Sequence, residues 1–203
     1  MFKLTVIDDD RWIAEGIACY FSEKHIRVNI LTEGHGEEMF RSVVGSDVII
    51  SEISACGLDV QALIELLATV KNLSPSTRLI ILTNLEERAI TGYICSALPG
   101  IKIVSKRSDI TLLANEIFGS VNNCTLQQKT TFSMPKNNVL TQREFGLLRL
   151  LATHRTLTDI GRVLRLSCKT VSHHRKSIIR KLNCSSITEL PPLLERLGFY
   201  KNQ

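Results

Sequence analysis

Short apolar runs alternate with longer amphipathic stretches over the first 120 residues. Five of the runs are rich in β-branched residues and have the length of buried strands. We predict strands at residues 3–8, 27–31, 47–52, 78–83 and 101–105. Apolar residues at helical spacing predict helices between and after them, at about 10–23, 36–45, 59–72, 86–97 and 108–120. Alternation of this kind is typical of an α/β, flavodoxin-like layer structure built on a parallel sheet.

From Val139 onward the pattern indicates helices alone. Three hydroxyl residues each stand three positions before an acid, which is the capping-box spacing; the pairs are Thr141 with Glu144, Thr156 with Asp159, and Ser186 with Glu189. We predict four helices at about 141–153, 156–165, 168–183 and 186–197. Only residues 165–167 join the second helix to the third, and so short a connection is typical of a helix-turn-helix.

The segment between the two patterns is polar, contains one proline and has no helical or strand periodicity. We interpret it as a linker. The predicted organisation is therefore a first domain over residues 1–121, a linker over 122–138 and an all-helical second domain over 139–203.

Charge is divided unevenly along the 203-residue chain. Residues 1–120 contain 11 lysines and arginines against 16 acids, whereas residues 139–203 contain 12 against 4. The formal charge of the whole chain is +5. An acidic first domain and a basic second domain indicate that the second one faces a polyanion such as DNA.

Composition argues against several other classes of protein. No apolar run approaches the roughly 20 residues of a membrane span, and acids at 8–10 interrupt any secretory signal, so we expect a cytoplasmic protein with no membrane partner. The six cysteines show no CxxC spacing, which argues against a zinc module and a disulfide framework. No nucleophile elbow or phosphate-binding glycine loop is present, so we expect neither an enzyme nor a small-molecule substrate.

The third predicted helix of the second domain has two contrasting faces. Val171, Ile178 and Leu182 fall at helical spacing and are expected to pack inward. On the other face, the residues expected to reach base edges in a major groove are Ser172, His173 and Lys176. Those expected to meet DNA phosphates are Lys169, Thr170, Arg175 and Arg180. The alternative is a helical bundle whose basic face is only solvated.

Two stretches of the second domain carry a family resemblance. LTQREFGLLRLLA (140–152) and LSCKTVSHHRKSIIRKLNCSS (166–186) resemble the DNA-binding domain of the NarL/FixJ/LuxR class. The resemblance implies a four-helix domain that binds one DNA half-site per protomer and dimerises partly through its last helix, here around Leu190 to Leu197. The second helix departs from the class pattern at Arg155, Leu157 and Gly161, which affects its entry angle.

The predicted sheet collects ionisable residues at the carboxyl ends of its strands. Asp8 and Asp9 follow the first strand, Glu52 ends the third, Thr83 ends the fourth, and Lys106 follows the fifth. Acids, a hydroxyl and a lysine at one sheet edge form a set suited to handling a phosphoryl group. We expect no required cofactor, and we take Asp8 and Asp9 as the candidate ligands for Mg²⁺.

Residues 3–120 resemble a CheY-like receiver domain, which the NarL/FixJ/LuxR class usually carries. On that pattern Asp8 and Asp9 are the acid pair, Thr83 is the switch hydroxyl, and Lys106 is the pocket lysine. Glu52 takes the position of the phospho-accepting aspartate. Three further departures are Cys56 where proline is usual, Val60 in place of a glycine, and Ile103 where a switching aromatic is common.

The methylene that Glu52 adds moves its carboxylate about 1.5 Å along the side chain, and in-line phosphoryl transfer tolerates little misplacement. We therefore expect phosphotransfer to Glu52 to fail. Two roles remain open for its charge. It either imitates part of a phosphoryl group toward Lys106 and Thr83, or it is a relic that pairs with Lys106 and holds the loop.

These observations predict a transcription regulator that binds promoter sites in double-stranded DNA as a dimer, without phosphorylation as its switch. One alternative is a phosphorelay response regulator that still accepts phosphate on its receiver. Another is an auxiliary subunit that acts by heterodimerisation with a related regulator, since the Rcs-type auxiliary regulators are similar in having degraded receivers.

Overall fold

The computed structural model describes residues 1–22, 25–33, 36–119 and 138–200. Contacts between residues divide the chain into two compact units. In the described part, the first unit contains residues 1–85 and 97–119, and the second contains residues 86–96 and 138–200. The predicted linker at 122–138 lies outside the described residues except for its last position.

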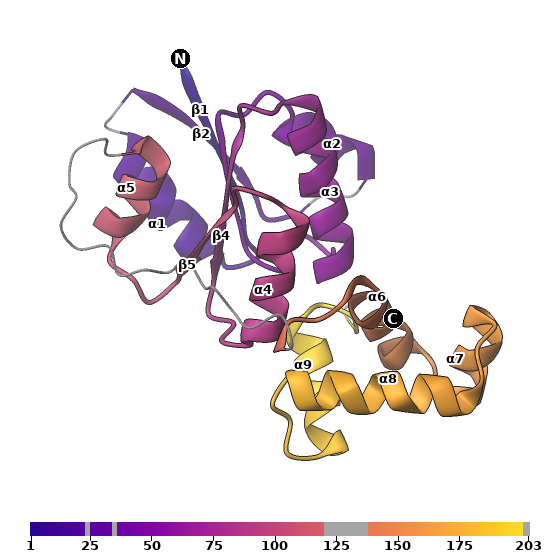
Figure 1. Cartoon of the computed structure of the whole chain (residues 1–203). Helices are drawn as coiled ribbons and strands as arrows, with labels where there is room; N and C mark the ends of the chain where they lie inside the picture. Colours follow the sequence, from indigo (N-terminus) through magenta and orange to yellow (C-terminus); the bar gives the residue numbers. More distant parts are fainter. Residues whose placement is uncertain (23–24, 34–35, 120–137, 201–203) are drawn as a thin grey trace. The chain divides into compact units, whose positions relative to one another are not determined.

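A five-stranded parallel sheet forms the centre of the first unit (Figure 1), which confirms the predicted α/β fold. Its strands are β1 (Phe2–Ile7), β2 (Ile26–Leu31), β3 (Val48–Ser51), β4 (Arg78–Thr83) and β5 (Lys102–Ser105), in the order β2-β1-β3-β4-β5. The register pairs Ile7 with Ser51 and Thr83 with Ser105. The carboxyl ends of β1, β3, β4 and β5 therefore meet at one edge of the sheet.

Helices cover both faces of this sheet, with α1 (Arg11–Ser22) and α5 (Ile110–Phe118) on one side and α2 (Gly36–Val43) and α3 (Val60–Leu73) on the other (Figure 1). Strand residues alternate between the two faces. Leu4, Val6 and Ile50 pack with α1 and α5 in one buried cluster. Ile49, in contrast, has the opposite orientation and is fully buried under the other layer. Burial of both faces explains why these strands are continuous apolar runs in the sequence.

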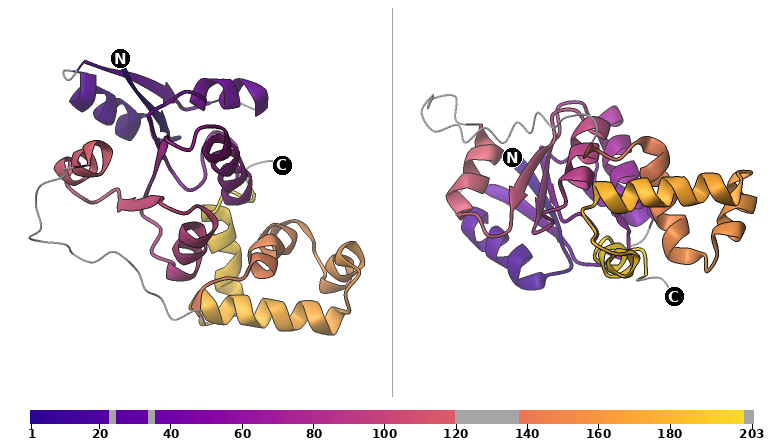
Figure 2. Two further views of the ribbon diagram at one scale, coloured as in Figure 1. Left: turned by 45° about the horizontal axis from the view of Figure 1, so that its top comes forward. Right: turned by 60° about the horizontal axis from the view of Figure 1, so that its bottom comes forward.

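The second unit is helical, and its long helix α8 packs against α6 and α7; Figure 2 gives two further views of these helices. It contains α4 (Arg88–Ala97) except for its last residue, α6 (Gln142–Thr153), α7 (Leu157–Leu164), α8 (Cys168–Lys181), a 3₁₀ turn (Ile187–Glu189) and α9 (Leu190–Arg196). Leu148 of α6, Ile160 of α7, and Val171 and Ile178 of α8 are at most 1% exposed. These apolar side chains form the core of the domain.

The three predicted helix starts differ in the structure. Thr141 and Glu144 form a complete capping box, and the Thr156 side chain accepts a hydrogen bond from the backbone N–H of Asp159. At the third start the prediction is wrong: Ser186 makes no side-chain capping bond, and a 3₁₀ turn precedes α9. There the carboxylate of Glu189 instead accepts a hydrogen bond from the Ser185 backbone N–H (2.7 Å), outside the reciprocal capping pattern.

Two further observations concern the described part of the chain as a whole. None of its helices is both long enough and apolar enough to cross a membrane. Its five cysteines, Cys19, Cys56, Cys95, Cys168 and Cys184, are free thiols.

Candidate functional site

Three ionisable side chains meet at the carboxyl edge of the sheet in the first unit; we refer to Asp8, Glu52 and Lys106 as the receiver cluster. The Nζ atom of Lys106 lies 2.7 Å from Oδ2 of Asp8 and 2.6 Å from Oε2 of Glu52. The exposed fractions of the three side chains are 4% for Asp8, 18% for Glu52 and 10% for Lys106. One ammonium group therefore bridges two carboxylates in a largely buried site.

Burial and pairing act in opposite directions on the receiver cluster. Desolvation raises the pKa of Asp8 above its ordinary value, although the hydrogen bond and charge of Lys106 oppose this. Desolvation would lower the pKa of Lys106, but the two carboxylates outweigh it, so the pKa of the lysine is raised. Lys106 therefore stays charged at neutral pH, and the second carboxylate is left without a cation of its own.

Glu52 has its remaining oxygen engaged locally. Its Oε1 accepts a hydrogen bond from the Ile53 backbone N–H (2.7 Å). The buried hydroxyl of Thr83 accepts a hydrogen bond from the Leu85 backbone N–H (3.2 Å) and so caps the loop that follows β4. The structure thus brings Glu52 to Lys106, whereas Thr83 takes part in a different local interaction.

Asp9 follows Asp8 directly, and a departure from the receiver pattern explains one of its contacts. Its Oδ1 accepts a 2.6 Å hydrogen bond from the backbone N–H of Cys56. A proline at this position would have no N–H to donate, and its φ near −65° is incompatible with the φ of +54° that Cys56 adopts. Cys56 in place of proline therefore allows this loop to bind the Asp9 carboxylate through its backbone.

The expected metal ligands do not form a cluster of their own. Asp8 pairs with Lys106, and Asp9 binds the Cys56 backbone. Among the residues that the structure describes, no group of three or more histidine, cysteine, aspartate or glutamate side chains is arranged to hold a metal ion. Mg²⁺ binding to Asp8 and Asp9 stays a prediction from the sequence.

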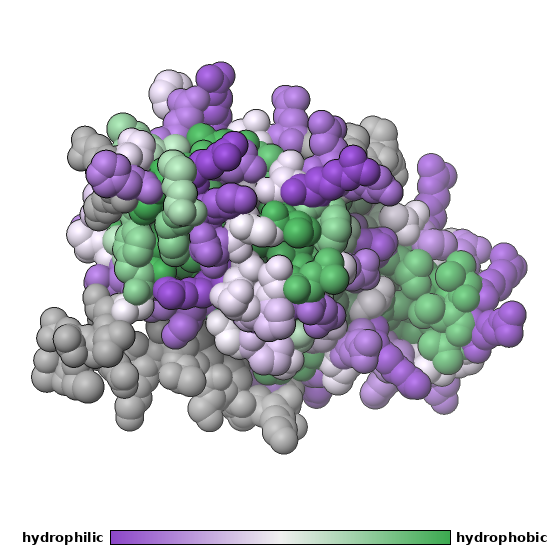
Figure 3. Space-filling model, turned by 90° about the horizontal axis from the view of Figure 1, so that it is seen from above, coloured by the Kyte–Doolittle hydropathy of each residue, from purple (hydrophilic) through white to green (hydrophobic). Residues whose placement is uncertain are grey.

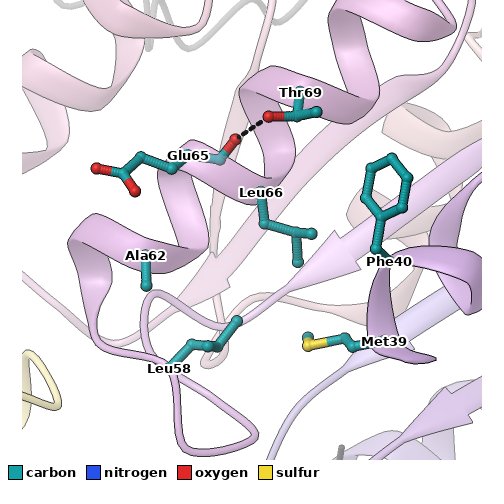
Figure 4. Close-up of a pocket in the computed structure, with 7 residues that line it drawn as sticks. All are labelled: Met39, Phe40, Leu58, Ala62, Glu65, Leu66 and Thr69. Carbon is teal, nitrogen blue, oxygen red and sulfur yellow. Dashed lines mark hydrogen bonds between the residues drawn. The ribbon is translucent and has the colours of Figure 1, made fainter. Parts of the chain in front are cut away.

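A separate hollow of about 280 Å³ lies between α2 and α3 (Figure 4), and it contains none of the predicted site residues. It is lined by Met39, Phe40, Leu58, Ala62, Glu65, Leu66 and Thr69. Most of these side chains are apolar. The chemistry of the first unit is therefore concentrated at the sheet edge and not in this hollow.

The second unit contains the predicted sharp turn between α7 and α8. Arg165 ends α7 with a left-handed φ of +54°, and the Leu166 backbone N–H donates to the carbonyl of Gly161 (2.8 Å). Ser167 then caps α8, because its side chain accepts a hydrogen bond from the Thr170 N–H (3.1 Å). A Cβ atom on Gly161 would lie only 2.7 Å from the Leu166 carbonyl oxygen. This close approach explains one departure from the class pattern, since only glycine fits here without a shift.

The two faces of α8 are arranged as the sequence predicted. Val171 and Ile178 are fully buried and Leu182 is 5% exposed. The exposed residues among the predicted DNA contacts are Lys169, Thr170, His173, Lys176 and Arg180, whereas Ser172 and Arg175 are half-buried. The Nε atom of Arg175 is buried without a hydrogen-bond partner, so only the outer nitrogens of its guanidinium group can meet a phosphate.

A buried polar network joins α6 to α8, and sequence reasoning missed it; we call Glu144, Ser177 and Lys181 the helix anchor. Lys181 Nζ and Ser177 Oγ each donate to the Glu144 carboxylate at 2.6 Å. Burial would raise the pKa of Glu144, but these donors and Thr141 lower it to about 2. The signal in the sequence was Glu144 itself, which we identified only as a capping residue.

The leucines of the last helix are packed inside the second unit. Leu190, Leu193, Leu194 and Leu197 are all at most 5% exposed. The resemblance to the NarL/FixJ/LuxR class placed part of a dimer contact at this helix. In this chain such a contact would have to use its exposed positions, such as Pro191, Pro192 and Glu195.

An apolar surface adjoins the start of α8. Val163 is 57% exposed, and Leu164 and Leu166 are each 40% exposed. Figure 3 shows an apolar patch with hydrophilic surroundings at the end of the molecule where Figure 1 places α7. Charged and apolar side chains are therefore both available beside the helix-turn-helix.

Comparisons with known proteins agree with this two-part organisation. Residues 138–192 match the family of bacterial regulatory proteins described as the luxR family. The chain is 31% identical to the nitrate/nitrite response regulator protein NarP of Escherichia coli over 146 residues, which cover 72% of this chain and 58% of NarP. It is 26% identical to the transcriptional regulatory protein LiaR of Bacillus subtilis over 93% of this chain and 94% of LiaR.

The fold also resembles a solved structure. RcsB from Salmonella enterica serovar Typhimurium, determined bound to a promoter, superimposes with a TM-score of 0.66 at 22% sequence identity. The match covers 96% of this chain and 99% of RcsB. The sheet, its ionisable edge and the helix-turn-helix thus define a two-domain response regulator. Residues 138–192 thus carry a luxR-family domain, and the chain is similar over most of its length to the regulators NarP and LiaR.

Proposed function

We propose that this protein binds promoter DNA with a sequence preference and that α8 is its recognition helix. The observation that carries the proposal is the contrast between the two faces of α8. One face is buried through Val171 and Ile178, and the other exposes His173 and Lys176. An exposed polar helix face behind a tight turn has the shape and the donors that major-groove recognition requires.

The proposed contacts fall into two groups. Ser172, His173 and Lys176 read base edges, because they project from neighbouring turns of one helix face. Lys169, Thr170, Arg175 and Arg180 contact phosphates, which supply affinity and register but little sequence information.

A mobility-shift assay of the purified protein with fragments of its own genome tests this proposal. We expect a few fragments to be retained at salt concentrations that release the rest. Lys176→Ala should weaken retention of those fragments, whereas Arg180→Ala should weaken binding to all fragments alike. Absence of any fragment preference, with the protein alone and with a related regulator added, would contradict the proposal.

For the receiver we propose that phosphorylation is not the switch. The support is the receiver cluster: Glu52 is one methylene longer than the family's aspartate, and Lys106 is bonded to both Glu52 and Asp8. The Cys56 backbone binds Asp9, the other candidate metal ligand. Attack on a phosphoryl donor would require Glu52 to leave its lysine and approach in line, and this geometry does not favour it.

Incubation with acetyl phosphate and Mg²⁺, followed by intact-mass measurement, tests this part. We expect no adduct of about 80 Da on the wild-type chain. A receiver with aspartate at the acceptor position, treated in the same tube, provides the control for the reagent. A stoichiometric adduct on this chain would instead favour the phosphorelay alternative.

Of the two roles considered for Glu52, we propose that it pairs with Lys106 and holds the loop, and that it does not imitate a phosphoryl group. In its support, the Glu52 oxygens bind Lys106 and the Ile53 backbone, and the Thr83 hydroxyl binds the Leu85 backbone. Glu52→Gln should therefore leave self-association and DNA affinity unchanged within about twofold, which is less than 1 kcal/mol. A larger change in either quantity would favour imitation.

We propose that the regulator acts on DNA as a dimer, either with a second copy or with a related regulator. The exposed positions of α9 and the resemblance to a class that binds half-sites support this. Light scattering of the protein with and without its retained DNA fragment distinguishes the two partners. Two results together would overturn the dimer. The complex would have the mass of one chain per fragment, and a related two-domain regulator added to the mixture would not co-purify with the protein.

A further inference from the structure

The carboxylate of Glu144 connects the start of α6 to the second half of α8 inside the second unit. Ser177 Oγ donates to Oε1 and Lys181 Nζ donates to Oε2, each at 2.6 Å. The side chains of Lys181 and Glu144 are 9% and 5% exposed. This is therefore a directed contact between two helices in the domain interior, and not a surface ion pair.

Glu144 is also fixed on its own helix. Its Oε2 accepts a hydrogen bond from the Thr141 backbone N–H (2.8 Å), and its backbone N–H donates to the Thr141 hydroxyl (3.2 Å). The capping box thus holds the carboxylate in one orientation before it meets α8. Ser177 and Lys181 of α8 therefore donate to a carboxylate whose orientation is already restricted, so it has little freedom to move with α8.

The donors occupy a distinct face of α8. At about 100° per residue, Ser177 and Lys181 lie roughly a quarter of a turn from the apolar face and a similar angle from the base-reading face. Apolar packing of Val171 and Ile178 is non-directional and tolerates small rotations. A rotation of α8 by about 20° moves a side-chain tip roughly 2 Å at the helix radius, which is enough to break a hydrogen bond.

The other end of α8 has its own restraint. The tight turn bonds Leu166 to Gly161 and leaves no room for a side chain at Gly161. The turn fixes where α8 begins, but one point does not fix the rotation of the helix about its axis. The helix anchor supplies the second point, more than two turns further along.

We propose that Glu144 is a positioning residue for DNA reading: through Ser177 and Lys181 it sets the rotation of α8 and so the direction in which Ser172, His173 and Lys176 point. This rests on the proposed function of α8 as the recognition helix. Glu144 itself contacts no DNA in this assignment. Its role is to fix site choice, separately from the general attraction of the basic domain for phosphates.

The double variant Glu144→Leu with Lys181→Met separates positioning from stability. Replacing a buried ion pair by apolar side chains of similar size is often neutral for folding. The exchange also leaves the net charge unchanged, so phosphate attraction is preserved. Ser177→Ala is the second variant, because it removes one donor without burying an unpaired charge.

The measurement is enrichment from a library of random DNA duplexes, with the thermal unfolding midpoint recorded for each protein. We expect the double variant to bind the average duplex as the wild type does, but to discriminate the best-enriched duplex from the average about tenfold less. For Ser177→Ala we expect a loss of about threefold, because Lys181 still holds the carboxylate. The matched control is Lys102→Met with Glu116→Leu, an exposed pair of the receiver (3.7 Å), which should leave discrimination unchanged.

Unchanged discrimination in both anchor variants would overturn the positioning role. If the double variant fails to fold, the result for Ser177→Ala decides by itself: a loss supports the role, and no change overturns it. If the wild type shows no sequence preference at all, the proposed function fails and this inference fails with it. If instead the wild type discriminates between duplexes and the variants discriminate equally well, only the positioning role of Glu144 fails.

Discussion

Each unit of this protein buries a lysine against carboxylate groups, and the two arrangements have opposite balances. In the receiver cluster one lysine is shared by two acids, and the pKa of Asp8 is raised because burial outweighs pairing. In the helix anchor one acid is shared by several donors, and the pKa of Glu144 is lowered to about 2. The receiver cluster therefore has more acids than cations, whereas the single carboxylate of the helix anchor is surrounded by donors.

The two clusters also differ in what brings their residues together. The receiver cluster lies where strand ends converge, so the fold itself brings the charges together. The helix anchor joins residues 33 and 37 positions apart on two packed helices, which only the helix packing brings together. The strand topology brings the first cluster together, whereas packing of α6 against α8 brings the second together.

The largest effect is expected from removing the shared cation of the receiver cluster. Lys106→Met leaves Asp8 and Glu52 buried without their common partner, so we expect unfolding to become easier by about 3–5 kcal/mol. Urea unfolding of the full chain, with hydrogen exchange of the β5 segment, measures it. Lys102→Met is the control, because Lys102 makes an exposed pair and its loss should cost less than about 1 kcal/mol. An equal effect of both substitutions would contradict the structural role assigned to Lys106.

Acid should act in opposite directions on the buried carboxylates Glu144 and Asp8 of the two units. The pKa of Glu144 is lowered from 4.5 to about 2, so its stabilisation is fully present above pH 4.5 and is lost as the pH falls toward 2. The contribution lost is about 3 kcal/mol. The pKa of Asp8 is raised, so its ionisation opposes folding and acid relieves that penalty.

Circular dichroism melting between pH 7 and pH 2 measures this difference, with hydrogen exchange used to assign it to α8 or to the sheet. Glu144→Gln should reduce the fall in the unfolding midpoint of the helical unit at acid pH. If the midpoint of the variant falls as steeply as that of the wild type, Glu144 is not the titrating group responsible.

A smaller effect is expected at the turn that fixes the other end of α8. Gly161→Ala places a Cβ atom 2.7 Å from the Leu166 carbonyl oxygen, and the turn must shift to accept it. We expect a loss of about 1–3 kcal/mol in the free energy of unfolding. Gly146→Ala is the matched control: nothing lies within 4 Å of its Cβ, and alanine should stabilise α6 by about 0.5–1 kcal/mol. If Gly161→Ala also stabilises the protein, the turn has more room at Gly161 than the 2.7 Å approach indicates.

The smallest effect is expected from neutralising the second acid of the receiver cluster. Glu52→Gln leaves the Asp8 pairing with Lys106 in place and keeps an oxygen for the Ile53 N–H. We expect the unfolding free energy to change by less than about 1 kcal/mol, far less than for Lys106→Met. A thermal unfolding series on both variants tests the order. An effect of Glu52→Gln as large as that of Lys106→Met would mean that Glu52 is the main partner of the lysine.

Much of the fold follows from local patterns in the sequence. The five strands and their parallel arrangement were predicted because apolar runs alternating with amphipathic stretches admit few other arrangements. The turn at 165–167 and the inward face of α8 were also predicted correctly. The start of the last helix was not, because Ser186 and Glu189 fit the capping spacing while the backbone there forms a 3₁₀ turn. Spacing alone does not show which partner a side chain will choose.

The sequence by itself determined which residues form the receiver cluster and the basic face of α8. It placed the acids and the lysine at the strand ends, with Glu52 in place of an aspartate. Tertiary structure decided how these residues are engaged. It joined Lys106 to two carboxylates, bound Asp9 to the backbone of Cys56, and connected Glu144 to Ser177 and Lys181. The physical reason is that periodicity places a residue on a face, whereas a hydrogen bond depends on atomic positions set by packing between distant segments.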